Sequence, residues 1–596
     1  MDKRIPLLMM LMLTPPVIAD AGDCEVSDCV DGVDTISNNF MLPRSFSSYK
    51  AREIISMQDN GAQSGKDDWA RHFNLNAGFM QSFGDSECRL GSLPFWSGTN
   101  KMTLGDNSGD YDVDLYQFGL GDIVSPGDIT LTPRVKHVGV DMLWVLNHKP
   151  DEAGFYMKVK APVGAYMIDM NLCENPAVVN QPDAEWMRYP ALDNRYKTLT
   201  DVFYGGFPNA EPDLDYGRIS SCRNTVVRLA DLETVLGYNV WVGDKGKAGL
   251  GFKFSAPTGN VPTAEFMLEP VFGRGSHWGV GAEFHANYQV WEGDDSSVCV
   301  KLLADVLHLT SGRRPTMRSF DLAANGPGSK YMLLQEYLAT DFTGAGYDQG
   351  AQPVGTRLPG NIIPAINITT QPVKSTFSVE GSMALLLDFK KNDWNMSIAG
   401  EFWGRSKEKL EIDCCKALEL GNQNFNDYAV LGRQIDLDGR FDILATDYDN
   451  ARLYFCEPLA RINKAEDRVL AQATPSQIAE NNTVMNQPPG GPVVAPDGTT
   501  PGVGSGTAVS ANTFNADKVK DARESKNRIP SVDGLDVDGA RSPRAFSGLV
   551  NLEVGYTWSD SDYVPHLALL GGVEFADKTS KMVSMWSVGL QGSLQF

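Results

Sequence analysis

Hydrophobic and polar residues alternate with a period of two along several segments of this chain, which is typical of a β-strand with one apolar and one polar face. Near the C-terminus, Trp586, Val588 and Leu594 share one face, and Gln591 and Gln595 lie on the other. The same alternation occurs in segments 155–165, 278–290, 377–389, 394–402 and 546–558. The apolar faces of these segments contain no charged residue, although 21% of the chain is charged.

The strands of a soluble β-sandwich also alternate in this way, so alternation alone does not distinguish a sandwich from a membrane barrel. The residues at the ends of the segments are more informative. Aromatic residues gather there, as they do in the interfacial girdles of membrane barrels. These aromatic residues are Trp278, Phe377, Phe389, Trp394, Tyr556, Trp558 and Phe596. After residue 21 no stretch approaches the roughly 20 apolar residues of a membrane-spanning helix. The pattern therefore predicts an all-β fold, an antiparallel transmembrane β-barrel.

The last strand also resembles the assembly signal of bacterial outer-membrane β-barrels, which ends in an aromatic residue with hydrophobic residues at alternate positions before it. Leu590, Leu594 and Phe596 carry this resemblance, although Gln591 stands where many members have glycine. The resemblance is to the porin-like class and not to a specific family. It implies a Gram-negative outer membrane, with outer-membrane lipid and the barrel-assembly machinery as partners.

Short connections with Gly, Asp, Asn and Pro fit the periplasmic turns of such a barrel. They lie at 148–154, 244–247, 292–296, 390–393 and 559–562. Placing them all in the periplasm predicts about twelve strands and both termini on that side. The expected strands are 69–83, 129–147, 153–169, 233–243, 248–257, 277–291, 297–310, 374–389, 394–405, 545–558, 563–576 and 582–596.

Two further details of the predicted topology concern a bulge and the number of strands. A change of phase between Val135 and Val138 predicts a β-bulge in the second strand. Segments 331–338 and 428–431 offer a further hairpin, so that fourteen strands are the alternative.

The N-terminus has the three parts of a secretory signal peptide: a basic start at Lys3 and Arg4, an apolar run, and a small-residue cleavage site ending at Ala21. Residues 1–21 are therefore expected to be removed on export. Residues 22–68 are predicted to form a periplasmic extension or a plug, with a short helix over 49–57.

The transmembrane barrel is expected to span residues 69–596, with long extracellular loops. The largest of these loops is 406–544, and its tract 481–515 is rich in Pro, Gly and Thr, which predicts a flexible exposed segment.

The nine cysteines of an exported chain are disulfide candidates. In the predicted topology, Cys173 pairs with Cys222, and Cys456 pairs with Cys414 or Cys415. Each such bond closes about fifty residues and contributes roughly 3–4 kcal/mol. An odd number of cysteines leaves at least one thiol unpaired or intermolecular.

Charged residues on the polar faces are expected to line the lumen. The candidates for solute selectivity are Lys158, Lys160, Lys253, Lys301, Glu283, His285, Glu380, Glu401 and Glu553. Because the lysines and the glutamates come from separate strands, they favour a channel for passive diffusion or uptake of small solutes, narrowed by disulfide-stapled loops. Ion pairs that fill a closed barrel are the alternative arrangement. The large loops favour a second function, a surface protein for adhesion whose barrel is only an anchor.

Other functions have less support in the sequence. Glu283 and His285 share a face, as a general base and its carboxylate do, but no nucleophile motif accompanies them, so an enzyme is not expected. Asp110, Asp112 and Asp114 are weak calcium candidates, because their spacing does not match a calcium loop, and no other cofactor or metal is expected. The formal net charge of −23 argues against nucleic acid as a partner.

Overall fold

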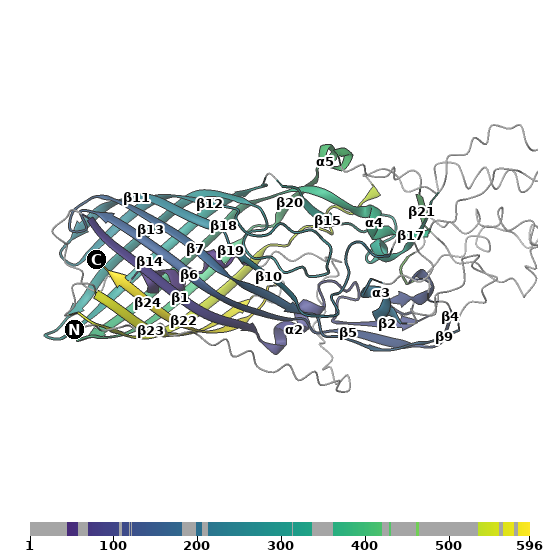
Figure 1. Cartoon of the computed structure of the whole chain (residues 1–596), viewed down its shortest axis with the longest axis horizontal. Coiled ribbons are helices and arrows are strands. Elements are labelled where there is room, and N and C mark those ends of the chain that lie inside the picture. Colours follow the sequence, from purple (N-terminus) through teal and green to yellow (C-terminus); the bar gives the residue numbers. More distant parts are fainter. Residues whose placement is uncertain are drawn as a thin grey trace, which may run out of the picture.

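The chain folds into a long barrel with a folded extension at one end (Figure 1). The computed structural model of the 596-residue chain describes residues 44–57, 69–105, 110–118, 120, 122–180, 198–205, 213–312, 314–336, 362–419, 428–430, 461–463, 534–559, 564–576 and 582–595.

Twelve antiparallel strands form the barrel, and each pairs with the next along the chain until β24 pairs with β1 and closes the sheet. The strands are β1 (Trp69–Ser82), β6 (Arg134–His148), β7 (Phe155–Asp169), β11 (Leu232–Gly243), β12 (Gly246–Ala256), β13 (Trp278–Glu292), β14 (Ser296–Thr310), β18 (Thr370–Lys391), β19 (Trp394–Arg405), β22 (Ala545–Thr557), β23 (Val564–Ala576) and β24 (Met585–Gln595). Their number and order confirm the prediction, and most bounds agree within a few residues.

Side chains alternate between an apolar outer face and an inner face. On β18, Met383, Leu385 and Leu387 are about half exposed, whereas Ala384 and Leu386 between them are buried. Closure pairs both edges of every strand, which lipid requires because it offers no hydrogen-bonding partner to free backbone groups. The apolar outer face and the closed sheet confirm the fold of a transmembrane β-barrel.

Among the described residues, no helix has both the length and the apolar character that crossing a membrane requires.

Short and long connections alternate around the barrel, except that the connection 577–584 between β23 and β24 is also short. The other short ones, 149–154, 244–245, 293–295, 392–393 and 558–563, all lie at the end where β1 begins and β24 ends. The long connections leave the opposite end, where β10 (Asn224–Leu229), β15 (Thr316–Ser319) and β20 (Glu408–Ile412) lengthen the wall by pairing with β7 or β18. This is the predicted arrangement of turns and loops.

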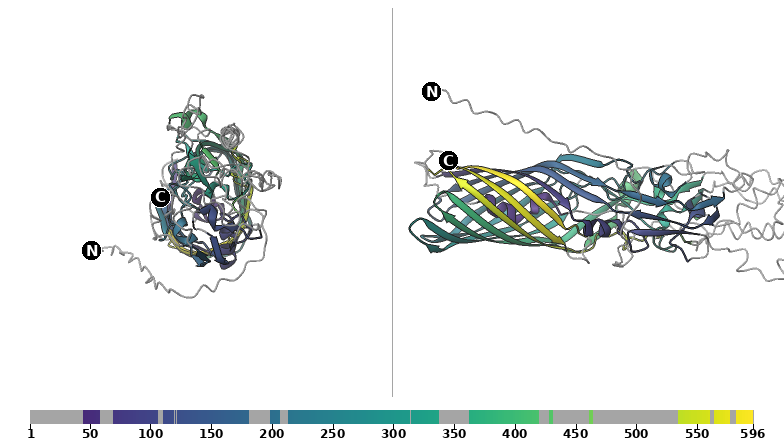
Figure 2. Two further views of the ribbon diagram at one scale, coloured as in Figure 1. Left: turned by 90° about the vertical axis from the view of Figure 1, so that its right-hand side faces the viewer. Right: turned by 90° about the horizontal axis from the view of Figure 1, so that it is seen from below.

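The long connections build small sheets and short helices beyond the barrel, which we call the cap (Figures 1 and 2). Its strands are β2 (Lys101–Gly105), β3 (Val113–Asp114), β4 (Asp122–Ser125), β5 (Gly127–Leu131), β8 (Leu172–Asn175), β9 (Val178–Asn180), β16 (Leu333–Glu336), β17 (Ile362–Pro364) and β21 (Tyr428–Val430). Its helices are α2 (Gly84–Gly91), η2 (Leu115–Phe118), α3 (Leu199–Phe203), η3 (Ser329–Tyr331), α4 (Ala365–Thr369) and α5 (Cys414–Glu419). Buried rings of Phe118, Phe203 and Tyr331 pack together inside it.

Two details of the predicted topology are wrong. The bulge between Val135 and Val138 does not occur, because the chain leaves the expected strand at Thr132–Pro133 and β6 then pairs without a shift in register. Proline lacks the N–H that a continuous ladder needs, so β5 and β6 belong to different sheets. The extra hairpin also fails as a barrel element, since β16 and β21 pair with each other in the cap.

Leu385 tests the lipid-facing position directly. It lies near the middle of β18, and its side chain is 55% exposed on the outer face. For Leu385→Arg we expect the unfolding free energy in lipid vesicles to fall by about 2–4 kcal/mol, because the charge enters hydrocarbon. Chemical denaturation in vesicles measures it. The control is Glu411→Arg on β20, where we expect a change within about 0.5 kcal/mol; equal losses in both variants would contradict the assignment.

Candidate functional site

A short helix preceding the first strand lies inside the barrel. Residues 44–57, which we call the lumen segment, contain η1 (Phe46–Ser48) and α1 (Lys50–Ser56), and every residue of both helices is buried. α1 packs against β14, β18, β19 and β22, and its purple ribbon is visible between the strands in Figures 1 and 2. The helix expected over 49–57 is therefore present, and it occupies the lumen.

Groups on the barrel wall cap both ends of α1. The helix follows Tyr49, which supplies no side-chain cap. Instead the Glu401 carboxylate on β19 accepts the backbone N–H groups of Lys50 and Ala51 at 3.1 and 2.8 Å. At the other end, His72 Nε2 on β1 lies 2.7 Å from the carbonyl oxygen of Ser56. Because the free N–H and C=O groups of a helix end need partners, the wall specifies where this helix begins and ends.

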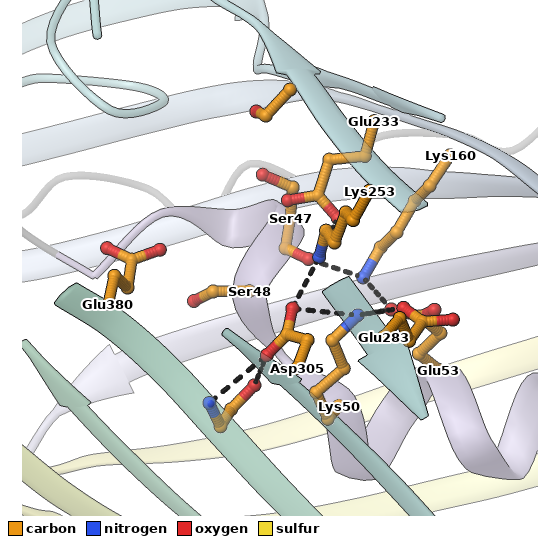
Figure 3. A network of polar contacts seen from close by, with 12 residues as sticks. Ser47, Ser48, Lys50, Glu53, Lys160, Glu233, Lys253, Glu283, Asp305 and Glu380 are labelled. Carbon is orange, nitrogen blue, oxygen red and sulfur yellow. Dashed lines mark hydrogen bonds and ion pairs between the residues drawn. The ribbon is translucent and has the colours of Figure 1, made fainter. Parts of the chain in front are cut away.

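Two charged residues of α1, Lys50 and Glu53, form ion pairs with the wall (Figure 3). Lys50 Nζ lies 2.7 Å from Glu53, 3.0 Å from Glu283 and 3.4 Å from Asp305. Lys158 contacts both Glu53 and Glu283. The helix thus contributes one cation and one anion to a cluster in which no side chain is more than 4% exposed.

Lys160 completes this cluster on β7. Its Nζ donates to the carbonyl oxygen of Ser47 at 2.8 Å and lies 3.4 Å from Glu53. Two lysines of the wall therefore converge on the single carboxylate of the lumen segment.

The first described residue, Arg44, makes a second set of contacts on the opposite part of the wall. Its guanidinium pairs with Glu401 on β19 and, at 3.1 Å, with Glu574 on β23. The same group lies over the rings of Tyr49 and Trp403, at 4.1 and 5.3 Å from their centroids. Cation–π contacts of this kind add to the attraction of the carboxylates.

Arg274, in the connection before β13, links the lumen segment to further strands. It lies 2.7 Å from Glu380, 2.8 Å from Glu233 and 3.3 Å from Asp231, and it donates to the Ser47 hydroxyl at 3.2 Å. The guanidinium can serve several acceptors at once because it carries five N–H groups.

The surrounding charges determine the ionisation of the lumen segment. Burial alone raises the pKa of Glu53, but the ammonium groups of Lys158 and Lys50 hold it well below its ordinary value. Burial likewise opposes the charge on Lys50, but Asp305 and Glu283 raise its pKa well above the usual range. Both groups are therefore charged at neutral pH.

The structure places the predicted lumen residues on the inner face. Lys158, Lys160, Lys253, Glu283, Glu380, Glu401 and Glu553 are buried there, and so is Lys301 at 7% exposure. Lys253 joins the cluster by pairing with Glu233 at 2.8 Å and Asp305 at 2.5 Å. Two predicted residues belong to separate pairs, Lys301 with Asp388 at 3.8 Å and Glu553 with His566 at 3.0 Å.

Glu283 and His285, considered above as a carboxylate and a general base, contact different partners. Glu283 pairs with Lys50 and Lys158, whereas His285 Nε2 lies 3.0 Å from the side-chain oxygen of Asn239.

The residues that sequence reasoning missed are Arg44, Lys50, Glu53, Asp231, Glu233, Arg274, Asp305 and Glu574. Asp305 and Glu574 had a usable signal, since each occupies the inward phase of its strand. Arg44 and Glu53 lie in the predicted extension or plug, but nothing in their local sequence indicates which residues of the barrel wall they contact.

The predicted disulfides are not formed as expected. Cys222, Cys414 and Cys415 are free thiols, so the Cys173–Cys222 bond is wrong, and Cys173 is disulfide-bonded, as is Cys88. Cys456, the expected partner of Cys414 or Cys415, lies outside the described residues.

The calcium candidates do not converge. Asp112 accepts from the backbone N–H and the hydroxyl of Thr103, both at 2.8 Å, while Asp110 is exposed and Asp114 is buried. Within the described ranges, no three His, Cys, Asp or Glu residues are grouped to hold a metal ion.

A small cavity remains beside the lumen segment, among Phe46, Tyr49, His137, Phe272 and Glu574. Its volume of about 30 Å³ accommodates one or two water molecules. The lumen segment and the wall are therefore closely packed here.

Two of the three comparisons with known proteins find no match to this chain. No family model and no curated protein matches it. Solved structures with some likeness include an outer membrane channel from Pseudomonas putida F1 (8% identity, TM-score 0.31, 90% of this chain and 100% of that one) and a Pseudomonas aeruginosa FadL homologue (9%, 0.23, 88% and 89%). TM-scores this low support no inference. The class rests on the closed, apolar-faced sheet: the chain is a β-barrel of the outer-membrane type.

The carboxyl group of Asp231 makes the folding stability of the protein depend on pH. The residue lies directly before β11 and accepts from the Ser45 hydroxyl at 2.9 Å. Burial raises its pKa from 3.8 to about 6, and the nearby Arg274 offsets only part of this. A carboxyl group with a raised pKa favours folding while protonated, and this contribution is lost as the pH rises through about 6.

We therefore expect Asp231→Asn, which is neutral at every pH, to be more stable than the wild type at pH 7.5 by about 2–3 kcal/mol. Near pH 4 the two proteins are expected to agree within about 0.5 kcal/mol. Denaturation in vesicles at both pH values measures the difference. A gap that is the same at both would contradict the raised pKa.

Proposed function

We propose that the protein is an outer-membrane channel for small solutes, in which the lumen segment closes the pore and solute passes when this segment moves. The observation that supports this proposal is the ionic contact of Arg44, Lys50 and Glu53 with the barrel wall. The lumen segment takes the role that the sequence had suggested for disulfide-stapled loops.

The chemistry of this contact favours a displaceable segment over a permanent filling. A buried ion pair is commonly no more stabilising than apolar side chains of the same volume, so a barrel that needs only a solid interior gains nothing from charges. A lumen that fills with water in one state needs a wall that water can solvate. Lys158, Lys160, Glu283 and Glu401 supply such a wall once the segment leaves.

The connections and the predicted signal peptide support one orientation of the barrel in the membrane. Barrels of this class have short periplasmic turns, which supports placing the end with the short connections in the periplasm and the cap outside the cell. The signal peptide predicted at 1–21 supports export. Leu590 and Leu594 face outward at 42% and 44% exposure, which supports their part in an assembly signal, while Phe596 lies outside the described residues.

The cap supports a second candidate function, contact with another surface. Its sheets and the buried rings of Phe118, Phe203 and Tyr331 form a packed structure at one end of the barrel, and its core is continuous with that of the lumen segment. A folded structure of this kind exceeds what a pore mouth requires, so adhesion with the barrel as an anchor is the alternative to transport.

Glu53→Gln tests the channel. The substitution leaves Lys158 and Lys160 facing a neutral amide, and breaking a buried pair costs about 3–5 kcal/mol. Part of this cost is relieved when the segment leaves and water reaches the lysines. In planar bilayers we expect the open probability of single channels to rise about tenfold, which corresponds to 1.4 kcal/mol.

Glu408→Gln is the matched control. Glu408 pairs with Arg318 at 2.9 Å, equally buried but on β15 and β20, away from the lumen segment. This variant is expected to lose stability without a change in open probability. Opening in both variants would indicate a general loosening of the barrel, and silence of all three folded proteins would favour the surface anchor.

A further inference from the structure

The contacts of Arg44 outline a binding site on the barrel wall. Its guanidinium pairs with the carboxylates of Glu401 and Glu574, and one Nη lies 3.5 Å from the Ser547 hydroxyl. The ring of Trp403 faces the same group, and all four wall residues are buried. We call Glu401, Trp403, Ser547 and Glu574 the guanidinium site.

The register of the barrel strands, and not the lumen segment, positions the residues of this site. Glu401 on β19 and Glu574 on β23 are both register partners of Leu549 on the intervening strand β22. Their side chains share the inner face, so two carboxylates stand level with each other, one strand apart on either side. Ser547 is the register partner of Trp403 and shares that inner face. The site therefore stays assembled whether or not Arg44 occupies it.

Departure of the lumen segment affects the wall charges unequally. Glu283 keeps Lys158, and Asp305 keeps Lys253. Glu401 and Glu574, however, have Arg44 as their only ion-pair partner among the described residues. An open lumen thus exposes two adjacent carboxylates without a cation, which is an unfavourable arrangement until a positive group arrives.

We propose that the guanidinium site recognises the transported solute, a small cation that bears a guanidinium group and takes the place of Arg44. This inference rests on the channel function proposed above. A solute in the site neutralises Glu401 and Glu574 and prevents the return of Arg44, so binding and opening are the same event. The segment excludes solutes that cannot make this exchange.

The geometry favours guanidinium over other cations. A planar fork of N–H groups can bond two carboxylates on different strands at once, and its face can stack on an indole. An ammonium is a compact, strongly hydrated point charge without that planar shape. Arg44 itself shows that the site accommodates the planar group in this pose.

Binding is tested on Arg44→Gly, full-length and refolded in vesicles, with free arginine as the probe. Citrulline is the matched control, because it replaces the guanidinium with a neutral ureido group of nearly the same shape. Millimolar arginine is expected to raise the unfolding temperature by about 2–4 °C, and citrulline to leave it unchanged. Equal effects of the two compounds, or none from either, would overturn the proposal.

Opening is tested on the wild type in planar bilayers. Arginine is expected to raise the open probability about tenfold over citrulline at the same concentration. In Glu574→Gln, which retains Arg44 but has lost one carboxylate of the site, this preference should disappear; this variant also serves if Arg44→Gly fails to insert.

The two readouts separate the two proposals. Channels that open without any preference for arginine would overturn the guanidinium site and leave the channel intact. Arginine binding to Arg44→Gly in a protein that never conducts would overturn the channel and leave the binding site intact.

Discussion

The structure depends on neutralising the charges that line the inside of the barrel. Lysine and glutamate side chains on the inward phase of the strands cannot reach lipid, and the packed lumen leaves them little water, so each must meet an opposite charge. The wall pairs some of its own charges, such as Lys253 with Glu233. It leaves others to the lumen segment, whose Arg44 and Glu53 complete opposite sides of the network.

This dependence connects the fold with the proposed function. The same carboxylate, Glu401, caps α1 and pairs with Arg44, so the helix, its position and its charge balance are coupled. A change at one contact is felt by the others because they share the segment. Such coupling suits a segment that is either fully bound to the wall or fully released from it. It also allows a competing cation to change the balance between these two positions.

The period of two was enough to predict the barrel, because lipid on one side enforces alternation at every strand, as Leu385 and Leu387 show. The inward direction of Lys158 and Glu401 follows from the same phase. The residues with which they pair cannot be predicted from this phase. Pairing depends on how strands distant in sequence are brought together and on a segment outside the sheet. Pro133 was a missed signal for the break between β5 and β6. Cys222 lies at a loop spacing that suits a bond, but spacing carries no information about proximity.

The most direct test measures the conductance of the channel and the position of the lumen segment in the same experiment. Ala51 is fully buried in α1, so in Ala51→Cys a bulky, membrane-impermeant thiol reagent reaches the introduced thiol only after the segment has left its place. During single-channel recording, we expect the reagent to react with the introduced thiol while channels are open and to hold them open. The conductance of the wild type should not change, although its exposed thiols Cys222, Cys414 and Cys415 react with the reagent in any state of the channel. Sustained conductance while the introduced thiol stays unmodified, confirmed by mass spectrometry, would contradict the claim that this segment closes the pore.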